Sequence, residues 1–83
     1  MTPNDSSKVS NKEELAQFLD VIMRDYALNG KEWENRDLPS FIEALQGWLQ
    51  DSDGYYANRK EDPGRISPWR RVADAIAAAR IYE

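Results

Sequence analysis

The residues best suited to chemistry lie in one short segment and comprise Asp51, Asp53, Tyr55, Tyr56 and Asn58. The chain contains no cysteine and no histidine. This removes Ser-His and Cys-His nucleophile pairs, the imidazole general base and almost every transition-metal site. An enzyme reading would therefore depend on Asp51 or Asp53 acting with a tyrosine in a desolvated pocket.

The order Asp51-Ser52-Asp53-Gly54 resembles the middle of a calcium-binding loop, but the surrounding residues do not fit. If Gly54 took the turn position of an EF-hand loop, Leu49 would occupy the first ligand position and Lys60 the last. Both positions require carboxylates. We therefore expect a helix C-terminal turn with solvated aspartates, and neither a metal nor a cofactor.

Charge narrows the classes of partner. The 83 residues carry a formal net charge of −4, which disfavours binding to a phosphate backbone. Basic clusters at Arg59-Lys60, Arg65 and Arg70-Arg71 lie close in sequence to Tyr55 and Tyr56, an arrangement that could hold single-stranded RNA. Acidic residues interleave with these clusters, however, so we expect intramolecular ion pairs and no nucleic-acid partner.

The chain lacks the signals of a membrane or exported protein. No run approaches the roughly 18 apolar residues of a transmembrane helix. Residues 1–8 have no apolar stretch behind their charges, so they do not form a signal peptide. We expect no membrane partner and a cytoplasmic location.

The length allows a single domain. Residues 1–10 are polar and predict a disordered tail, which leaves 11–83 as a single helical domain. Apolar residues recur with helical period over three stretches, near 11–29, 38–51 and 67–81. The fold class predicted is all-α, a small three-helix domain with a long loop between the second and third helices.

Particular residues mark the ends of these helices. Asn11, Asp37 and Ser67 have the types and positions of N-caps, and Gly30 favours a left-handed end to the first helix. The apolar stripes contain Leu15, Phe18, Leu19, Ile22, Met23 and Tyr26 in the first helix, Leu38, Phe41, Ile42, Leu45, Trp48 and Leu49 in the second, and Trp69, Val72, Ala73 and Ile76 in the third.

Small residues and tryptophans refine this picture. Alanines in the third helix permit close approach, which predicts that it packs centrally against the other two. Gly47 suggests a neighbouring helix or indole close to the second helix. Trp48 and Trp69 continue apolar stripes and are predicted to be core, while Trp33 precedes its helix like a hydrophobic staple and is read as core packing or an exposed role.

The chain also resembles a family of short bacterial proteins of unknown function. The resemblance lies in Trp33-x-Asn35-x-x-Leu38-x-x-Phe41-Ile42-Glu43-Ala44-Leu45-x-x-Trp48-Leu49-x-Asp51-x-x-Gly54-Tyr55-Tyr56-x-Asn58 and in Trp69-x-x-Val72-Ala73-Asp74-x-Ile76-x-Ala78-Ala79-x-x-Tyr82-Glu83. It covers about residues 11–83. It implies a small cytosolic helical domain with no established activity and no catalytic residues to carry over.

Two functional hypotheses remain. The first is a non-catalytic protein-interaction module that binds another protein, of unknown identity, through a loop containing Asp51, Asp53, Tyr55, Tyr56 and Asn58, since tyrosine is enriched at interfaces. An alternative, which the resemblance suggests by analogy with small acidic proteins of this kind and not by any motif, is an immunity-type or regulatory partner of a toxin or enzyme. The second hypothesis is a carboxylate-dependent enzyme using Asp51 or Asp53.

Overall fold

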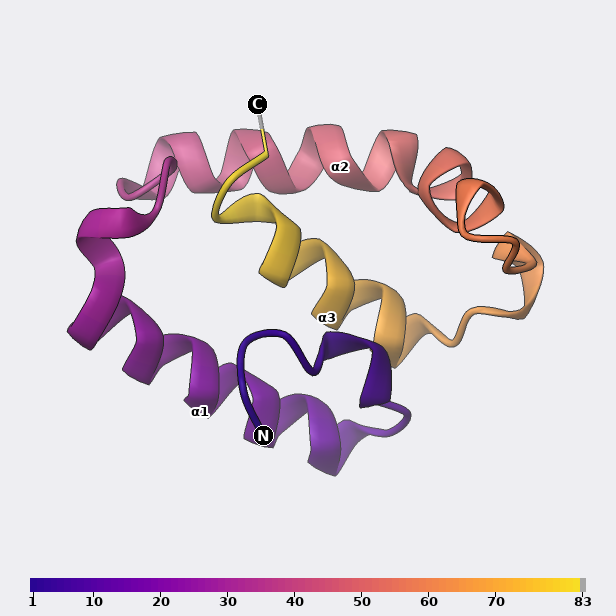
Figure 1. Ribbon diagram of the computed structural model, residues 1–83, viewed down its shortest axis with the longest axis horizontal. Coiled ribbons are helices and arrows are strands. Elements are labelled where there is room, and N and C mark those ends of the chain that lie inside the picture. Colours follow the sequence, from indigo (N-terminus) through magenta and orange to yellow (C-terminus); the bar gives the residue numbers. More distant parts are fainter. Residues whose placement is uncertain (83) are drawn as a thin grey trace.

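The computed structural model describes residues 1–82, and they fold into three α-helices (Figure 1). These are α1 (Lys12–Asn29), α2 (Leu38–Asn58) and α3 (Pro68–Ala79). Short 3-10 turns lie at η1 (Ser6–Lys8), η2 (Gly30–Glu32) and η3 (Pro63–Arg65). No strand occurs within residues 1–82, so the all-α prediction is confirmed.

The predicted N-caps are present at all three helices. The side chain of Asn11 accepts from the Glu14 amide, that of Asp37 from Ser40 and that of Ser67 from Arg70. Each bond satisfies an amide that has no acceptor within its own helix. The predicted left-handed end of α1 is wrong: Gly30 has a φ of −57°, and the chain continues directly into η2.

The long loop predicted after residue 51 is not found, because α2 continues to Asn58. Gly54 lowers helix propensity by about 1 kcal/mol relative to Ala, but tertiary packing outweighs that penalty. Ser52 and Tyr56 on this extension are buried. The helix ends only where Lys60 takes a left-handed φ of 60°. The residues predicted to form a binding loop therefore belong to a rigid element.

The third helix occupies the centre of the domain, as its alanines predicted. Ala73 packs with Phe18 and Ile22 of α1, whereas Ala75 packs with Trp48 and Tyr56 of α2. In Figure 1, α3 runs between the other two helices. The core is thus divided into two clusters, one on each side of α3.

The N-terminal segment has defined packing, so the structure does not support the predicted disordered tail over residues 1–10. Val9 is 1% exposed and joins the cluster of Phe18 and Ala73, and η1 contacts α3. Composition pointed to disorder because this segment holds so few apolar residues. A single buried valine, next to the start of α1, nonetheless attaches it to the core.

The three helices form essentially one layer. The Cα extents are 34 × 27 × 17 Å, and Figure 1 views the layer down its shortest axis. Most domains contain at least two packed layers. The accessible surface of 5660 Å² exceeds the value of about 5,100 Å² typical of a 9.6 kDa monomer. The N-terminal segment covers one side of the layer, where Pro3, Asn4 and Ser6 line a shallow pocket with residues of α3.

Candidate functional site

The five residues predicted to bind a partner do not form one surface. Asp51, Tyr55 and Asn58 follow one another along one side of α2, at helical spacings of four and three residues. Asp53 lies on another side. Tyr56 is 0% exposed and therefore cannot touch a partner directly. The two aspartates also do not converge on a common pocket.

Tyr82 contacts α2 at two residues, Asp51 and Gly47. The Tyr82 hydroxyl donates to Asp51 at 2.5 Å, and this hydrogen bond raises the pKa of Tyr82. A Cβ placed on Gly47 would lie 3.4 Å from the Tyr82 ring. The predicted close approach at Gly47 is therefore present, but it is made by Tyr82 and not by a helix or an indole.

Tyr56 belongs to a buried polar network. Its hydroxyl donates to Asp74 at 2.7 Å, and Arg70 Nε donates to the same carboxylate at 3.1 Å. The Arg70 guanidinium also donates to both oxygens of Glu61, at 2.6 and 3.1 Å. Bidentate pairs of this kind are strong and geometrically specific. The network joins the end of α2, the following loop and α3.

The pKa directions agree with a network that holds charges in place. Burial, together with the hydrogen bond to Asp74, raises the pKa of Tyr56 well above its usual value. The hydrogen bonds from Arg70 and then from Arg59 lower the pKa of Glu61 to about 2. Among the described side chains, no buried polar atom is left without a partner. We therefore assign the network a structural role.

The expected intramolecular ion pairing is confirmed for the arginines of the basic clusters, and no ion pair is seen for Lys60 among residues 1–82. Arg71 donates to Asp53 at 2.9 Å, to Ser52 Oγ at 2.6 Å and to the Pro63 carbonyl at 2.8 Å. Arg65 lies 3.6 Å from Asp62. These pairs place carboxylates beside the arginines of the basic clusters.

A second polar junction connects α1, the segment before α2 and the end of α3. Trp33 Nε1 donates to Asp25 at 2.8 Å, and this hydrogen bond is the main cause of the lowered pKa of Asp25. Asn35 Nδ2 donates to the carbonyl of Ala79, the last residue of α3, and to that of Tyr82 just after the helix, which satisfies acceptors at its C-terminal end. Trp33, half-buried, packs against the core cluster that contains Phe18.

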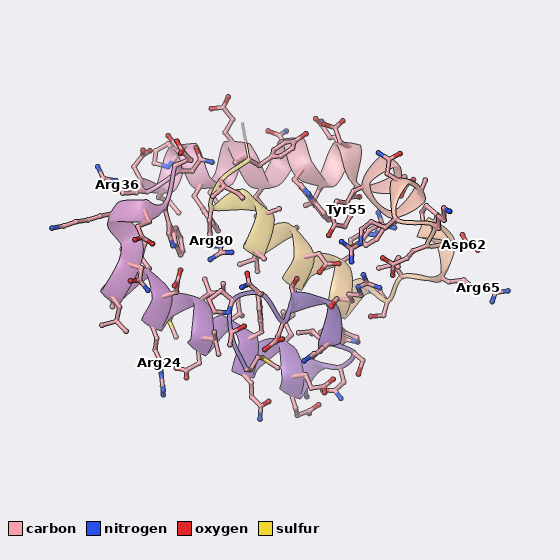
Figure 2. All side chains as sticks on the ribbon, in the orientation of Figure 1. Arg24, Arg36, Tyr55, Asp62, Arg65 and Arg80 are labelled. Atoms are coloured by element: carbon pink, nitrogen blue, oxygen red, sulfur yellow. The ribbon has the colours of Figure 1, made fainter. Side chains whose placement is uncertain are left out.

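The side of the layer opposite the N-terminal segment is apolar and uncovered. Leu19, Met23 and Tyr26 of α1 and Ile76 of α3 line one concavity there, together with Phe41 of α2. By helical spacing, Trp69 and Val72 share Ile76's side of α3, and Leu38, Ile42 and Leu49 share the side of α2 next to Phe41. We call this surface the open face and define it by these nine side chains, leaving out Phe41. Ile76 is half-buried and the other eight are exposed, with Met23 the most exposed on α1's part of the face at 64%. Charged side chains such as Arg24 and Arg65 project from the edge of the layer, as Figure 2 shows.

A concavity of about 460 Å³ opens on this face. Its lining is almost entirely apolar and comprises Leu19, Ile22, Met23, Tyr26, Trp33, Phe41 and Ile76. The prediction that Trp69 is core is wrong: it is 41% exposed and stands on the open face at the other end of α3 from Ile76. Trp48, by contrast, is 4% exposed, which confirms its prediction.

Sequence reasoning missed the open face although its signal was present. The apolar stripes of α1 and α2 are wide: Phe18 and Ile22 are buried, but Leu19 and Met23 on the same stripe are exposed. Each stripe is wide enough to pack against a second layer as well as against a neighbouring helix, and its pattern predicts that the whole stripe is buried. In a single layer, only the part of each stripe that faces α3 can be covered.

Comparison with protein families matches residues 11–83, nearly the whole described fold, to the family of unknown function DUF7660. The chain belongs to this family. No curated protein and no solved structure matches it. The DUF7660 match begins after the N-terminal segment and covers all three helices and therefore the entire open face.

None of the helices in residues 1–82 is both long and apolar enough to cross a membrane. Over the same residues, no group of three acidic side chains is placed to bind a metal ion.

Proposed function

We propose that this chain is a non-catalytic protein-interaction module and that the open face is its binding surface. The observation that carries the proposal is the set of eight exposed apolar side chains on one side of a single helical layer. Small soluble monomers rarely expose a contiguous apolar patch above a few hundred Å². Covering such a surface with another chain removes it from water and supplies the missing second layer.

The composition of the open face fits binding better than catalysis. None of its nine side chains is charged, and the concavity beside Met23 and Phe41 has apolar walls. Tryptophan, tyrosine and methionine are enriched at protein interfaces because they offer large contact areas. The carboxylate-dependent alternative lacks this support: Asp51 does pair with a tyrosine, Tyr82, but Asp51 and Asp53 are both exposed, so neither lies in the desolvated pocket that such chemistry requires.

Two substitutions to glutamate, one on the open face and one away from it, test the proposal. Met23→Glu places a charge in the open face, whereas Leu28→Glu places the same charge on an 82% exposed leucine of α1 that does not line the concavity. We expect capture of partner proteins from the source cell's extract to be lost with Met23→Glu and kept with Leu28→Glu. Equal capture by both variants, with unchanged circular dichroism, would contradict the proposal. The captured proteins also test the immunity-type alternative.

A second candidate surface is the outer side of α2 that carries Asp51, Tyr55 and Asn58. The observation in its favour is Gly54, an exposed glycine inside a helix around which a Cβ would meet nothing within 4 Å. Packing within residues 1–82 gives no reason for a glycine there. Asn58→Ala and Gly54→Ala should weaken capture if this surface takes part, and Gly54→Ala should otherwise only stabilise the helix, by about 1 kcal/mol.

A further inference from the structure

The open face has the shape of a surface that pairs with itself. At one end of α3 stands Trp69, the largest side chain of the face, and it is exposed. Near the other end, Ile76 lines the apolar concavity with Met23 and Phe41. The two positions are seven residues apart, which is about 10 Å along a helix. A projection and a hollow on the same face are what a self-complementary interface requires.

We infer that a second copy of this chain covers the open face, related to the first by a two-fold axis. This axis lies in the plane of the interface, runs perpendicular to α3 and passes close to Val72. It turns α3 end for end, so Trp69 of each copy lies over the concavity of the other. The two single layers then stack into a two-layer helical domain with one continuous core. This inference rests on the proposed function, because it names the occupant of the same binding surface.

The available area agrees with this arrangement. The exposed parts of the eight side chains amount to roughly 700–800 Å² per chain, taking about 200 Å² for each large side chain, while standard stable interfaces bury about 800 Å² per partner. A second copy therefore has enough apolar surface to form a stable dimer without help from other parts of the chain.

Electrostatics does not oppose the pairing, even though each copy is acidic. Two chains with a net charge of −4 repel one another in general. The nine side chains of the open face carry no charge, however, so none of them brings an ionised group that would lose its water when two faces meet. Arg24 lies on the same helix as Met23 but is exposed and pairs with Asp20 at 3.0 Å.

Sedimentation equilibrium of the full chain, from micromolar to millimolar concentration, tests the inference. We expect a mass of twice 9.6 kDa for the wild type and for Leu28→Glu. Met23→Glu and Trp69→Ala should raise the dissociation constant by about 100-fold or more, as interface anchors do. Circular dichroism should show the same helical content in every variant. A wild type that stays at 9.6 kDa throughout overturns the inference.

Cysteine scanning tests the position of the axis, because the chain has no native cysteine. Residues beside a two-fold axis meet their own symmetry copies, so Val72→Cys should form an intermolecular disulfide on mild oxidation. Leu28→Cys is the matched control and should remain monomeric on a non-reducing gel. Efficient cross-linking of Leu28→Cys with none of Val72→Cys would overturn the proposed arrangement.

The capture experiment separates this inference from the proposed function. If the wild type is monomeric but Met23→Glu alone loses a different protein from the extract, the face binds a heterologous partner and only the dimer is wrong. If the wild type is monomeric and neither glutamate variant changes capture, both proposals are wrong.

Discussion

The two sides of the helical layer differ in what covers them. On one side, the N-terminal segment approaches α3, where the helix carries the small or polar side chains of Ala77, Ala78 and the buried Asp74. On the other side, the same helix presents Trp69 and Val72, which are 41% and 42% exposed, and the half-buried Ile76. The comparison teaches that helical periodicity reports how much apolar surface a helix carries, but not whether the chain itself buries it.

Removing a side chain from the interior below the covered side should have the largest effect. We expect Trp48→Ala to lower the free energy of unfolding by about 3–5 kcal/mol, because it leaves a cavity among Tyr56 and Ala75. A domain of this size can lose its fold at that cost. Urea titration measures the change. A nearly unchanged midpoint would mean that the covered side contributes little to the core.

The attachment of the N-terminal segment should contribute a smaller amount. Val9→Ala removes part of a 1% exposed side chain from the cluster of Phe18 and Ala73, so we expect a loss of about 1–3 kcal/mol. Ser7→Ala, at an exposed position of η1, is the control and should change the stability by less than about 0.5 kcal/mol. Similar effects of the two substitutions would indicate that this segment does not cover the layer.

Among these substitutions, one on the open face should change the free energy of unfolding of the unassociated chain by the smallest amount. Measured below the concentration at which chains associate, Met23→Gln should alter the free energy of unfolding by about 0.5 kcal/mol or less, because the side chain is already 64% exposed. At high concentration the same variant should melt well below the wild type, since only the wild type gains stability from association. Parallel thermal scans at the two concentrations measure this.

Lowering the pH should weaken the polar network of Tyr56, Asp74, Arg70 and Glu61. The pKa of Glu61 is lowered from 4.5 to about 2 in the folded chain, so its pairing with Arg70 stabilises the fold fully above pH 4.5 and is lost as the pH falls toward 2. Glu61→Gln should therefore flatten the loss of stability in this window. Glu43→Gln removes an exposed carboxylate and is the control. An equally steep acid limb in all three proteins would show that the Arg70 pair does not contribute to it.

Local signals in the sequence were enough for the helices and their beginnings. Asn11, Asp37 and Ser67 cap their helices because a capping bond depends only on residues three apart. The end of α2 could not be predicted in this way. Gly54 and the acids around it indicate a turn, and only the burial of Tyr56 against α3, eighteen residues from its partner Asp74, keeps the helix going.

The candidate site was harder to predict for the same reason. Tyr55 and Tyr56 are adjacent in sequence, yet one is partly exposed and the other is buried, and their assignment depends on where α3 lies. Trp69 continues an apolar stripe as regularly as Trp48 does. Which of the two indoles is covered depends on the number of layers in the fold, a property that no local pattern contains.

The central position of α3 has a consequence for cooperativity. α1 and α2 each bury their core residues mainly against α3, the last helix in the chain, and Asn35 bonds across 44 and 47 residues to its end. Neither of the earlier helices can be stable before α3 is in place, since isolated helices of this length are marginal in water. The amide protons of all three helices should therefore exchange with solvent through one common opening event, and not helix by helix.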